Sequence, residues 1–355
     1  MKSSDVSVVV CAYTHRRWND ICAAITSVVK QDELPAELIV VTDHNDELGD
    51  DLRDFVRRVQ PTTPVRVIAN SGPRGLSGAR NTGVVAAEAA VVAFLDDDAV
   101  ADPGWLGHMV ARYDNPAVRG VGGGARPRWP GGARPAWFPA EFDWVVGCSY
   151  PGQPEQAGPV RNFIGANMSL RRDDILAAGG FHTGLGRVGR IPLGCEETEL
   201  CIAIAQLYAG TRMIYDPQMS VSHRVTDDRI EPRYFFRRCH AEGISKAAVS
   251  GLVGSADGLS SERTYTARVL PRGLVYRMWG LIRGPGAVAD VIVGARGRRD
   301  LGAQFAMIVS GALVTVFGYA RGRVVGAAIP PRSQSLTDDG ADGETSGRGA
   351  SRLAN

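Results

Sequence analysis

Short apolar runs alternate with amphipathic segments over the first hundred residues of the chain. Val6–Ala12 is rich in β-branched residues throughout, as expected of a strand that is buried on both faces. Three similar runs follow, and the segments between them carry apolar residues at helical spacing. The predicted strands are Val6–Ala12, Leu38–Val41, Val65–Ile68 and Val91–Leu95, and the predicted helices are Asn19–Val29, Leu48–Val59 and Ser77–Ala90. This alternation predicts an α/β fold, in which a mostly parallel central sheet is covered by helices on both faces.

The pattern changes after residue 115. Residues 119–155 are rich in glycine, proline and tryptophan, which predicts short strands and a long functional loop. Beyond them we expect two short helices and two strands, at Asp173–Ala178, Glu196–Tyr208, Met213–Asp216 and Ser220–Ser222. We therefore assign residues 1–250 to one domain with two halves, 1–115 and 116–250.

Apolar and basic residues interleave in residues 262–330. An apolar residue recurs at every fourth position, at Leu270, Leu274, Met278 and Ile282. Arginines between them, Arg268, Arg272, Arg277 and Arg283, predict a basic amphipathic helix. Leu301–Tyr319 has no charged residue, but its glycines and polar residues dilute a run that barely reaches the length of a membrane-spanning helix. We expect this helical region to contact a membrane peripherally, with an oligomer interface or a cover for the catalytic domain as the alternatives. We expect residues 333–355 to form a disordered tail.

Composition and charge narrow the possible functions. The 355 residues carry a net charge of +2, which excludes a strongly basic nucleic-acid binder. Residues 261–332 nevertheless carry a charge of +8, which suits an anionic membrane surface. The six cysteines are dispersed without a Cys-x-x-Cys pair, so a zinc ribbon is not expected. The apolar run after the polar Met1–Asp5 is too short for a signal peptide, so we expect a cytoplasmic protein.

Three consecutive acids, Asp96, Asp97 and Asp98, follow the fourth predicted strand. Ligands of a parallel sheet bind beyond the carboxyl ends of its strands, and adjacent carboxylates repel one another unless a cation neutralises them. Oxygen ligands at this place suit Mg²⁺ or Mn²⁺, bound together with phosphate groups. The alternative is a solvated turn before the next helix.

Three other segments carry candidate chemistry. Arg74–Asn81 combines two glycines with two arginines ahead of a small-residue helix, which lets backbone and guanidinium groups approach phosphate. Glu196, Glu197 and Glu199 open a predicted helix, and Glu196 and Glu199 could serve only as partners of the helix dipole, as acids in a first turn commonly do. His223 follows a predicted strand, and a lone histidine is more often structural than a metal ligand. The first strand leads into Cys11–His15, so the Gly-x-Gly-x-x-Gly fingerprint of dinucleotide binding is absent there.

The order of these segments resembles the inverting glycosyltransferases of family 2, which have the Rossmann-like GT-A fold. Val-Val-Val-Cys-Ala-Tyr-Thr matches the first-strand motif, Gly-Leu-Ser-Gly-Ala-Arg-Asn the glycine-rich segment, and Phe-Leu-Asp-Asp-Asp the metal-binding Asp-x-Asp. Asn-Phe-Ile-Gly-Ala-Asn-Met resembles the acceptor-side strand, and Glu196-Glu197 takes the place of the family's Glu-Asp. The Gln-x-x-Arg-Trp motif of processive synthases is absent, so the chain resembles a single-addition enzyme of the actinobacterial type.

The resemblance implies a site residue by residue. Residues 1–115 would bind a nucleotide-diphosphate sugar through Ala12, Tyr13, Thr14, Asp43, Arg74, Gly78, Arg80, Asp96 and Asp97. Mg²⁺ or Mn²⁺ would be held by Asp98, Asp96 and His223. Residues 116–250 would bind a glycan or lipid-linked acceptor through Gly165, Ala166, Asn167 and Trp137, although a tryptophan in such a loop is at least as often a packing anchor.

The expected reaction is transfer of one sugar to an acceptor hydroxyl with inversion, in cell-surface glycan or glycolipid synthesis at the cytoplasmic face of a membrane. Glu197 stands where the family usually has aspartate, which leaves open whether Glu197 or Glu196 is the general base. Two alternatives remain. One is a sugar-phosphate nucleotidyltransferase, which would release pyrophosphate, and the other is a non-catalytic membrane-associated scaffold. No nucleic-acid partner is expected.

Overall fold

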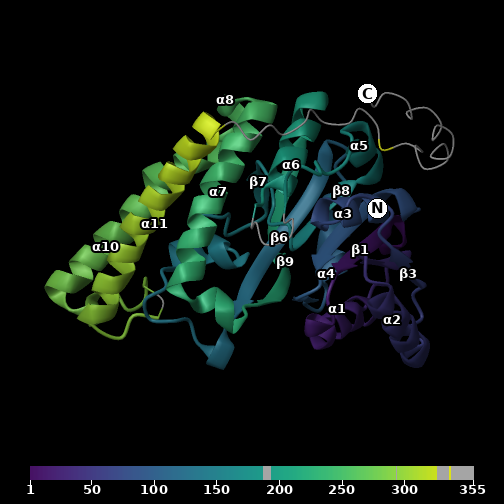
Figure 1. The fold of residues 1–355 in the computed structure, drawn as a ribbon, viewed down its shortest axis with the longest axis horizontal. Helices are drawn as coiled ribbons and strands as arrows, with labels where there is room; N and C mark the ends of the chain where they lie inside the picture. Colours follow the sequence, from purple (N-terminus) through teal and green to yellow (C-terminus); the bar gives the residue numbers. More distant parts are fainter. Residues whose placement is uncertain (187–192, 293, 326–335, 337–355) are drawn as a thin grey trace, which may run out of the picture.

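The computed structural model describes residues 1–186, 193–292, 294–325 and 336. Within these residues nine strands form one sheet, and helices pack against both of its faces (Figure 1). Apolar side chains of the first strand alternate between two cores, with Val8 and Val10 in one and Val9 in the other. The period of two along each strand therefore supplies both helix layers with apolar surface.

The first seven regular elements alternate between strand and helix, as predicted. They are β1 (Val6–Ala12), α1 (Trp18–Val29), β2 (Glu37–Thr42), α2 (Asp46–Val59), β3 (Val65–Ala69), α3 (Leu76–Ala86) and β4 (Val91–Asp96). Their strands are parallel and adjacent in the order β3-β2-β1-β4. The predicted strands and helices of this half are confirmed, with ends that differ by at most a few residues.

The strands after β4 depart from the expected arrangement. β8 (Asn167–Arg171) inserts between β4 and β6 (Val118–Arg128) and runs antiparallel to both. β9 (Arg212–Arg224) is parallel to β6 but antiparallel to β5 (Ala99–Ala101) and β7 (Gly158–Val160). The sheet is therefore mixed: six of its nine strands run in one direction, and β5, β7 and β8 run in the opposite one. An apolar run indicates that a strand is buried, but it does not indicate the direction of the neighbouring strand.

β6 and β9 are longer than the sequence pattern suggested. The expected strands at 213–216 and 220–222 are parts of one continuous β9, and residues 119–155 begin with β6 before two 3-10 turns, Pro130–Gly132 and Ala140–Val146. Gly123 is needed where β6 meets β9, because a Cβ there would lie 1.5 Å from the carbonyl oxygen of Met219. The glycines that suggested a loop serve instead to bring two strands close together.

Eight further helices complete the described part of the chain. They are α4 (Trp105–Arg112), α5 (Arg172–Ala177), α6 (Glu196–Leu207), α7 (Pro232–Val253), α8 (Ser255–Gly258), α9 (Ser260–Thr264), α10 (Leu270–Arg283) and α11 (Arg298–Val325). A π-helical turn, Tyr265–Val269, joins α9 to α10. The helices α7, α10 and α11 lie together at the end of the molecule away from α1 and α2 (Figure 1).

Glycines bring α7 and α11 into direct contact. A Cβ on Gly243 of α7 would lie 2.1 Å from the carbonyl oxygen of Thr315, and one on Gly318 of α11 would lie 2.2 Å from that of His240. Backbone therefore packs on backbone along this pair of helices. The C-terminal helices are held against the sheet domain through α7, which the sequence pattern did not reveal.

The four-residue apolar repeat of α10 is divided between two faces. Leu270 is buried, whereas Met278 and Ile282 are exposed. Because the α-helix has 3.6 residues per turn, each step of four residues advances about 40° past a full turn, so the ends of the repeat lie about 120° apart. Arg277 does not face outward as expected: its guanidinium is buried and forms an ion pair with Glu141 at 2.8 Å.

Candidate active site

Residues from the sheet and from the C-terminal helices line one cleft of about 1480 Å³. The cleft includes the residues at the carboxyl ends of β1, β2 and β4, where ligands of such sheets bind. Sites for a single small ligand commonly measure roughly 300–1,000 Å³. The cleft therefore has room for more than one substrate at a time.

Asp96, Asp98 and His223 come together in this cleft. β4 ends at Asp96 and β5 begins at Ala99, so the acids occupy the turn between these strands. Ala99 pairs with His223 of β9, which brings the imidazole against Asp98 with 3.1 Å between Nε2 and Oδ1. One potential ligand atom from each of the three residues lies within 4.8 Å of the others.

Burial and charge act differently on the members of this acidic cluster. Burial alone would raise the pKa of Asp98, but His223, Arg17 and Arg229 together outweigh it and hold that pKa well below its usual range. Burial disfavours the charged imidazole, yet Asp98 raises the pKa of His223 to about 10. For Asp97, burial raises the pKa to about 7 even though Arg17 forms an ion pair with it at 2.5 Å.

The donor set fits a divalent metal ion. Two carboxylates and an imidazole lie within mutual reach, and Oδ2 of the buried Asp97 has no hydrogen-bond partner among the described residues. Hard oxygen ligands of this kind suit Mg²⁺ or Mn²⁺. Arg17, to which the sequence analysis gave no role, lies 3.2 Å from Asp98 and compensates part of the buried negative charge.

Arg80 connects the acidic cluster to the start of α6. Its buried guanidinium lies 3.1 Å from Asp96 and 3.0 Å from Glu196, and it donates a further hydrogen bond to the carbonyl oxygen of Gly165 at 2.8 Å. These contacts occupy the group that was expected to meet phosphate. In this structure Arg80 therefore links the acidic cluster at the end of β4 to the glutamates at the start of α6.

The two glutamates at the start of α6 have different surroundings. Glu196 is buried against Arg80, whereas the half-buried Glu197 lines the cleft and accepts a hydrogen bond from Thr198 Oγ1 at 3.0 Å. Burial, together with the charge of Glu196, raises the pKa of Glu197 to about 7. A carboxylate of this kind can accept a proton near neutral pH.

Comparisons with known proteins decide the family. The model of glycosyl transferase family 2 matches residues 7–176. The glucosyl-dolichyl phosphate glucuronosyltransferase of Haloferax volcanii is 34% identical over 281 residues, which are 79% of this chain and 88% of that protein. The succinoglycan biosynthesis protein ExoO of Rhizobium meliloti is 35% identical over 113 residues, which are 32% of this chain and 31% of that protein. The chain belongs to glycosyltransferase family 2.

The fold agrees with this assignment. The mannosyltransferase PcManGT from Pyrobaculum calidifontis, solved in complex with GDP-Man and Mn²⁺, has a TM-score of 0.55 to this chain at 18% identity, with 89% of each chain covered. The protein is thus a family 2 glycosyltransferase with the GT-A fold and a C-terminal helical region. Membership of this family favours glycosyl transfer over the nucleotidyltransferase and the scaffold.

Most residues that the resemblance implied for this glycosyltransferase line the cleft. They are Ala12, Tyr13, Thr14, Asp43, Arg74, Arg80, Asp96, Asp97, Asp98, Gly165, Ala166, Glu196, Glu197 and His223. Asp43 accepts hydrogen bonds from Asn70 Nδ2 at 2.7 Å and from the backbone N–H of Gly75 at 3.0 Å. This carboxylate therefore fixes the turn that carries Arg74.

Three implied residues are not part of the described cleft lining, and each has a structural role. Gly78 packs against the backbone of Pro73, where a Cβ would lie 1.9 Å from its carbonyl oxygen. Asn167 is fully buried and donates to the carbonyl oxygens of Gly124 and Met219. Trp137 packs in an aromatic cluster against Phe138 and Phe235, at centroid distances of 5.2 and 5.9 Å.

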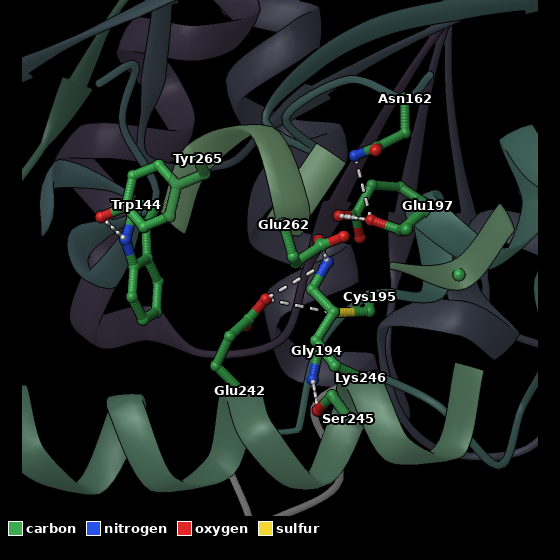
Figure 2. A network of polar contacts seen from close by, with 12 residues as sticks. Trp144, Asn162, Gly194, Cys195, Glu197, Glu242, Ser245, Lys246, Glu262 and Tyr265 are labelled. Carbon is green, nitrogen blue, oxygen red and sulfur yellow. Dashed lines mark hydrogen bonds and ion pairs between the residues drawn. The ribbon is translucent and has the colours of Figure 1, made fainter. Parts of the chain in front are cut away.

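The sequence analysis missed the part of the cleft that comes from α7 and the segment after it. Arg238, Glu242 and Lys246 recur at intervals of four along α7 and line the cleft. Trp144 also lines it, and its Nε1 donates a hydrogen bond to the hydroxyl of Tyr265 at 3.2 Å (Figure 2). A proline at the start of a charged segment, Pro232, was the available signal for a helix here.

Proposed function

We propose that this glycosyltransferase moves one sugar from a nucleoside-diphosphate sugar to a hydroxyl of a lipid-linked glycan, with inversion and with Mg²⁺ or Mn²⁺. One observation supports this best: Glu197 and the cluster of Asp96, Asp98 and His223 line the same cleft, which is large enough for two substrates.

The donor would lie against the carboxyl ends of β1 and β4. Arg74 is exposed in the cleft and forms no ion pair within the described part of the chain, so its guanidinium is available to the donor phosphates. Tyr13 is also exposed there. A metal ion bound by Asp96, Asp98 and His223 would stabilise the negative charge that builds on the departing diphosphate.

Glu197 is the proposed general base. An acceptor hydroxyl is a weak nucleophile, and it loses its proton as it attacks the anomeric carbon. The Glu197 carboxylate faces the cleft and burial raises its pKa to about 7, while the Glu196 carboxylate is held by Arg80. Attack on the face opposite the leaving diphosphate inverts the anomeric centre.

The cleft wall supports a lipid-linked acceptor. The wall continues from Glu242 and Lys246 to residues of α11, namely Ala312, Thr315, Val316 and Tyr319. Val316 is 64% exposed, so it belongs both to the cleft wall and to the outer surface of the molecule. The wall of the cleft thus reaches an exposed apolar residue of α11, which suits the chain of a lipid.

The outer surface of α10 and α11 supports attachment to a membrane. Its exposed apolar residues are Val275, Met278, Trp279 and Ile282 on α10 and Val309, Leu313, Val316, Phe317 and Val324 on α11. We name this surface the apolar face. The same part of the chain carries eight exposed arginines, at 268, 272, 283, 296, 298, 299, 321 and 323, and such charges favour an anionic leaflet.

α11 is long and apolar enough to span a membrane, with a mean hydropathy of 1.7 in a window that is 28% buried. Its backbone packs on α7. Because α7 carries Arg233, Arg237 and Lys246, moving it into a bilayer would cost free energy. These contacts favour a helix that lies along the cytoplasmic face of the membrane. A contact between two copies of the chain through the apolar face is the alternative.

A thermal-shift panel of UDP-, GDP- and dTDP-sugars, with and without Mn²⁺, tests the proposed donor class. A true donor at a hundred times its Kd stabilises the folded state by about 2.7 kcal/mol, so one sugar nucleotide should raise the midpoint only with Mn²⁺. Turnover should release free nucleoside diphosphate. Release of pyrophosphate, or no Mn²⁺-dependent shift with any donor, would overturn the proposal.

A further inference from the structure

The turn before α6 has an unusual backbone. Cys195 precedes the helix with φ of 71° and ψ of 15°, in the left-handed region, and its side chain does not cap the helix. His44 and Gln60 are the other described residues with a Cβ and a positive φ. A residue with a Cβ is strained in this conformation, so surrounding contacts must hold it there.

Two side chains of α7 hold this turn (Figure 2). The backbone N–H of Gly194 donates to Ser245 Oγ at 3.1 Å, and the thiol of Cys195 donates to Glu242 Oε1 at 3.3 Å. Ser245 is fully buried, and its hydroxyl in turn donates to the carbonyl oxygen of Ala241. The turn is therefore attached to α7 at two consecutive residues.

Glu242 is itself fixed by a chain of charges. It accepts a hydrogen bond from Arg238 at 3.2 Å and lies 3.5 Å from Lys246 Nζ, which also contacts Glu262 at 2.8 Å. Arg161 then binds both carboxylate oxygens of Glu262, at 2.7 and 2.9 Å. Burial favours a neutral Glu242, but Lys246 and Arg238 outweigh it and lower its pKa, so this carboxylate is a charged acceptor for the thiol.

The turn determines the direction of Glu197, two residues further on. Glu197 lies in the first turn of α6, so the backbone at 194–195 sets where its carboxylate begins. On its other side Thr198 Oγ1 donates to Glu197 Oε1, and Asn162 Nδ2 donates to Thr198 Oγ1, both at 3.0 Å. Contacts from α7 thus hold the backbone just before α6, and a chain of hydrogen bonds from Asn162 reaches the carboxylate of Glu197 (Figure 2).

We propose that Ser245 and Glu242 are positioning residues, which hold Gly194 and the strained Cys195 so that Glu197 faces the acceptor hydroxyl. This inference rests on the proposed role of Glu197. It assigns a part in the reaction to α7. This helix lies outside residues 7–176, which the family model matches. The charged groups that face Glu197, namely Glu196, Arg80 and Lys246, then act on a carboxylate in a fixed place.

The test is a carboxyl ¹³C NMR titration of the full-length protein labelled at glutamate, with the Glu197 signal assigned from its loss in Glu197→Gln. It needs no acceptor. In the unaltered protein Glu197 should titrate near pH 7. In Ser245→Ala the turn is released and Glu197 reaches solvent, so its pKa should fall by about one pH unit or more toward the ordinary value of about 4.3.

Two variants make this test specific. Ser250→Ala, the same change at another buried serine of α7, should leave the titration unchanged. Adding Cys195→Gly to Ser245→Ala should bring the pKa of Glu197 most of the way back to its raised value, because glycine adopts the left-handed conformation without strain. If Ser245→Ala did not fold, Cys195→Ala, which removes the contact with Glu242, should lower the same pKa.

The outcomes separate the two proposals. An ordinary pKa for Glu197 in the unaltered protein would contradict the proposed base itself. A raised pKa that survives Ser245→Ala and Cys195→Ala would overturn only the positioning role. If the pKa of Glu197 fell equally in Ser245→Ala and in the double variant with Cys195→Gly, the positioning role would also be overturned. Ser245 would then act by some means other than holding the strained residue.

Discussion

At the residue scale, the site depends on how Arg80 divides its contacts. A single buried guanidinium pairs with both Asp96 and Glu196, and no arginine within the described residues forms an ion pair with the partly buried Glu197. The sequence shows two adjacent glutamates and cannot distinguish them, because the choice depends on a residue more than one hundred positions away. Only the folded chain makes one of them a salt-bridge partner and the other a candidate base.

Glu197→Gln should lower turnover by a factor on the order of 10² to 10⁴, the usual contribution of a general base. Donor affinity should not change, because the proposed role of Glu197 is to meet the acceptor and not the donor. Steady-state kinetics and calorimetric donor binding check both statements. Glu196→Gln should instead weaken donor binding, because it leaves Arg80 with one carboxylate partner fewer. The opposite pattern would transfer the role of base to Glu196.

Asp98→Asn should abolish the Mn²⁺-dependent part of donor binding, a loss of at least about tenfold, because it removes a direct carboxylate ligand without changing the side-chain volume. Calorimetry of donor binding with and without Mn²⁺ measures this loss. His223→Ala should have a smaller effect, since water can replace one neutral ligand. Donor binding by Asp98→Asn that Mn²⁺ still enhances would argue against the metal site.

At the element scale, the sequence predicts those helices and strands that have one clear pattern of apolar residues. β1 to β4 and α1 to α3 are apparent because each strand is an unbroken apolar run and each helix has one apolar side. α7 escapes detection because it is buried on several sides, so apolar and polar residues alternate without a single stripe. The direction of β8 is equally hidden, since it follows from the path of the chain between strands. Asn167 illustrates the same limit, because a motif residue proves to be a buried structural amide.

Gly243→Ala should destabilise the protein by about 1–3 kcal/mol, the usual cost of forcing atoms into a packed interior. The added methyl group would meet the backbone of Thr315 and Tyr319 at 2.1 and 2.5 Å, and neither can move without shifting α11. Urea denaturation measures the change. Gly251→Ala is a matched control on the same helix with no atom near the new Cβ, and it should be neutral or stabilising by up to about 1 kcal/mol.

At the scale of the whole molecule, the apolar face and the donor end of the cleft belong to different parts of the structure. The apolar face is formed by α10 and α11, whereas the proposed donor end is formed by the ends of β1, β2 and β4. A protein attached through α10 and α11 would take its soluble donor from the aqueous side and its lipid-linked acceptor from the membrane side. The basic charge of residues 261–332 was visible in the sequence, but the burial of Arg277 was not.

The full-length protein should float with vesicles that contain phosphatidylglycerol, and high salt should release part of it because the arginine contacts are screened. The triple variant Trp279→Ser, Ile282→Ser and Phe317→Ser should remain in the soluble fraction, since it removes three exposed apolar residues from the apolar face. Val85→Ser, which removes an exposed apolar residue of α3, should float normally. Vesicle binding unchanged in the triple variant, together with a concentration-dependent dimer, would assign the apolar face to a contact between copies.

The buried ion pair between Glu141 and Arg277 has a consequence for protein engineering. Arg277 also donates to Gln304 of α11, and Gln304 donates to the carbonyl oxygen of Ala136, so the segment around residues 136–141 is joined to both C-terminal helices. Chimaeras that graft the C-terminal helices of one relative onto the catalytic half of another would separate these partners and leave a carboxylate buried without its cation. A graft should therefore carry residues 129–147 together with α10 and α11, because these distant stretches of the chain behave as one unit of exchange.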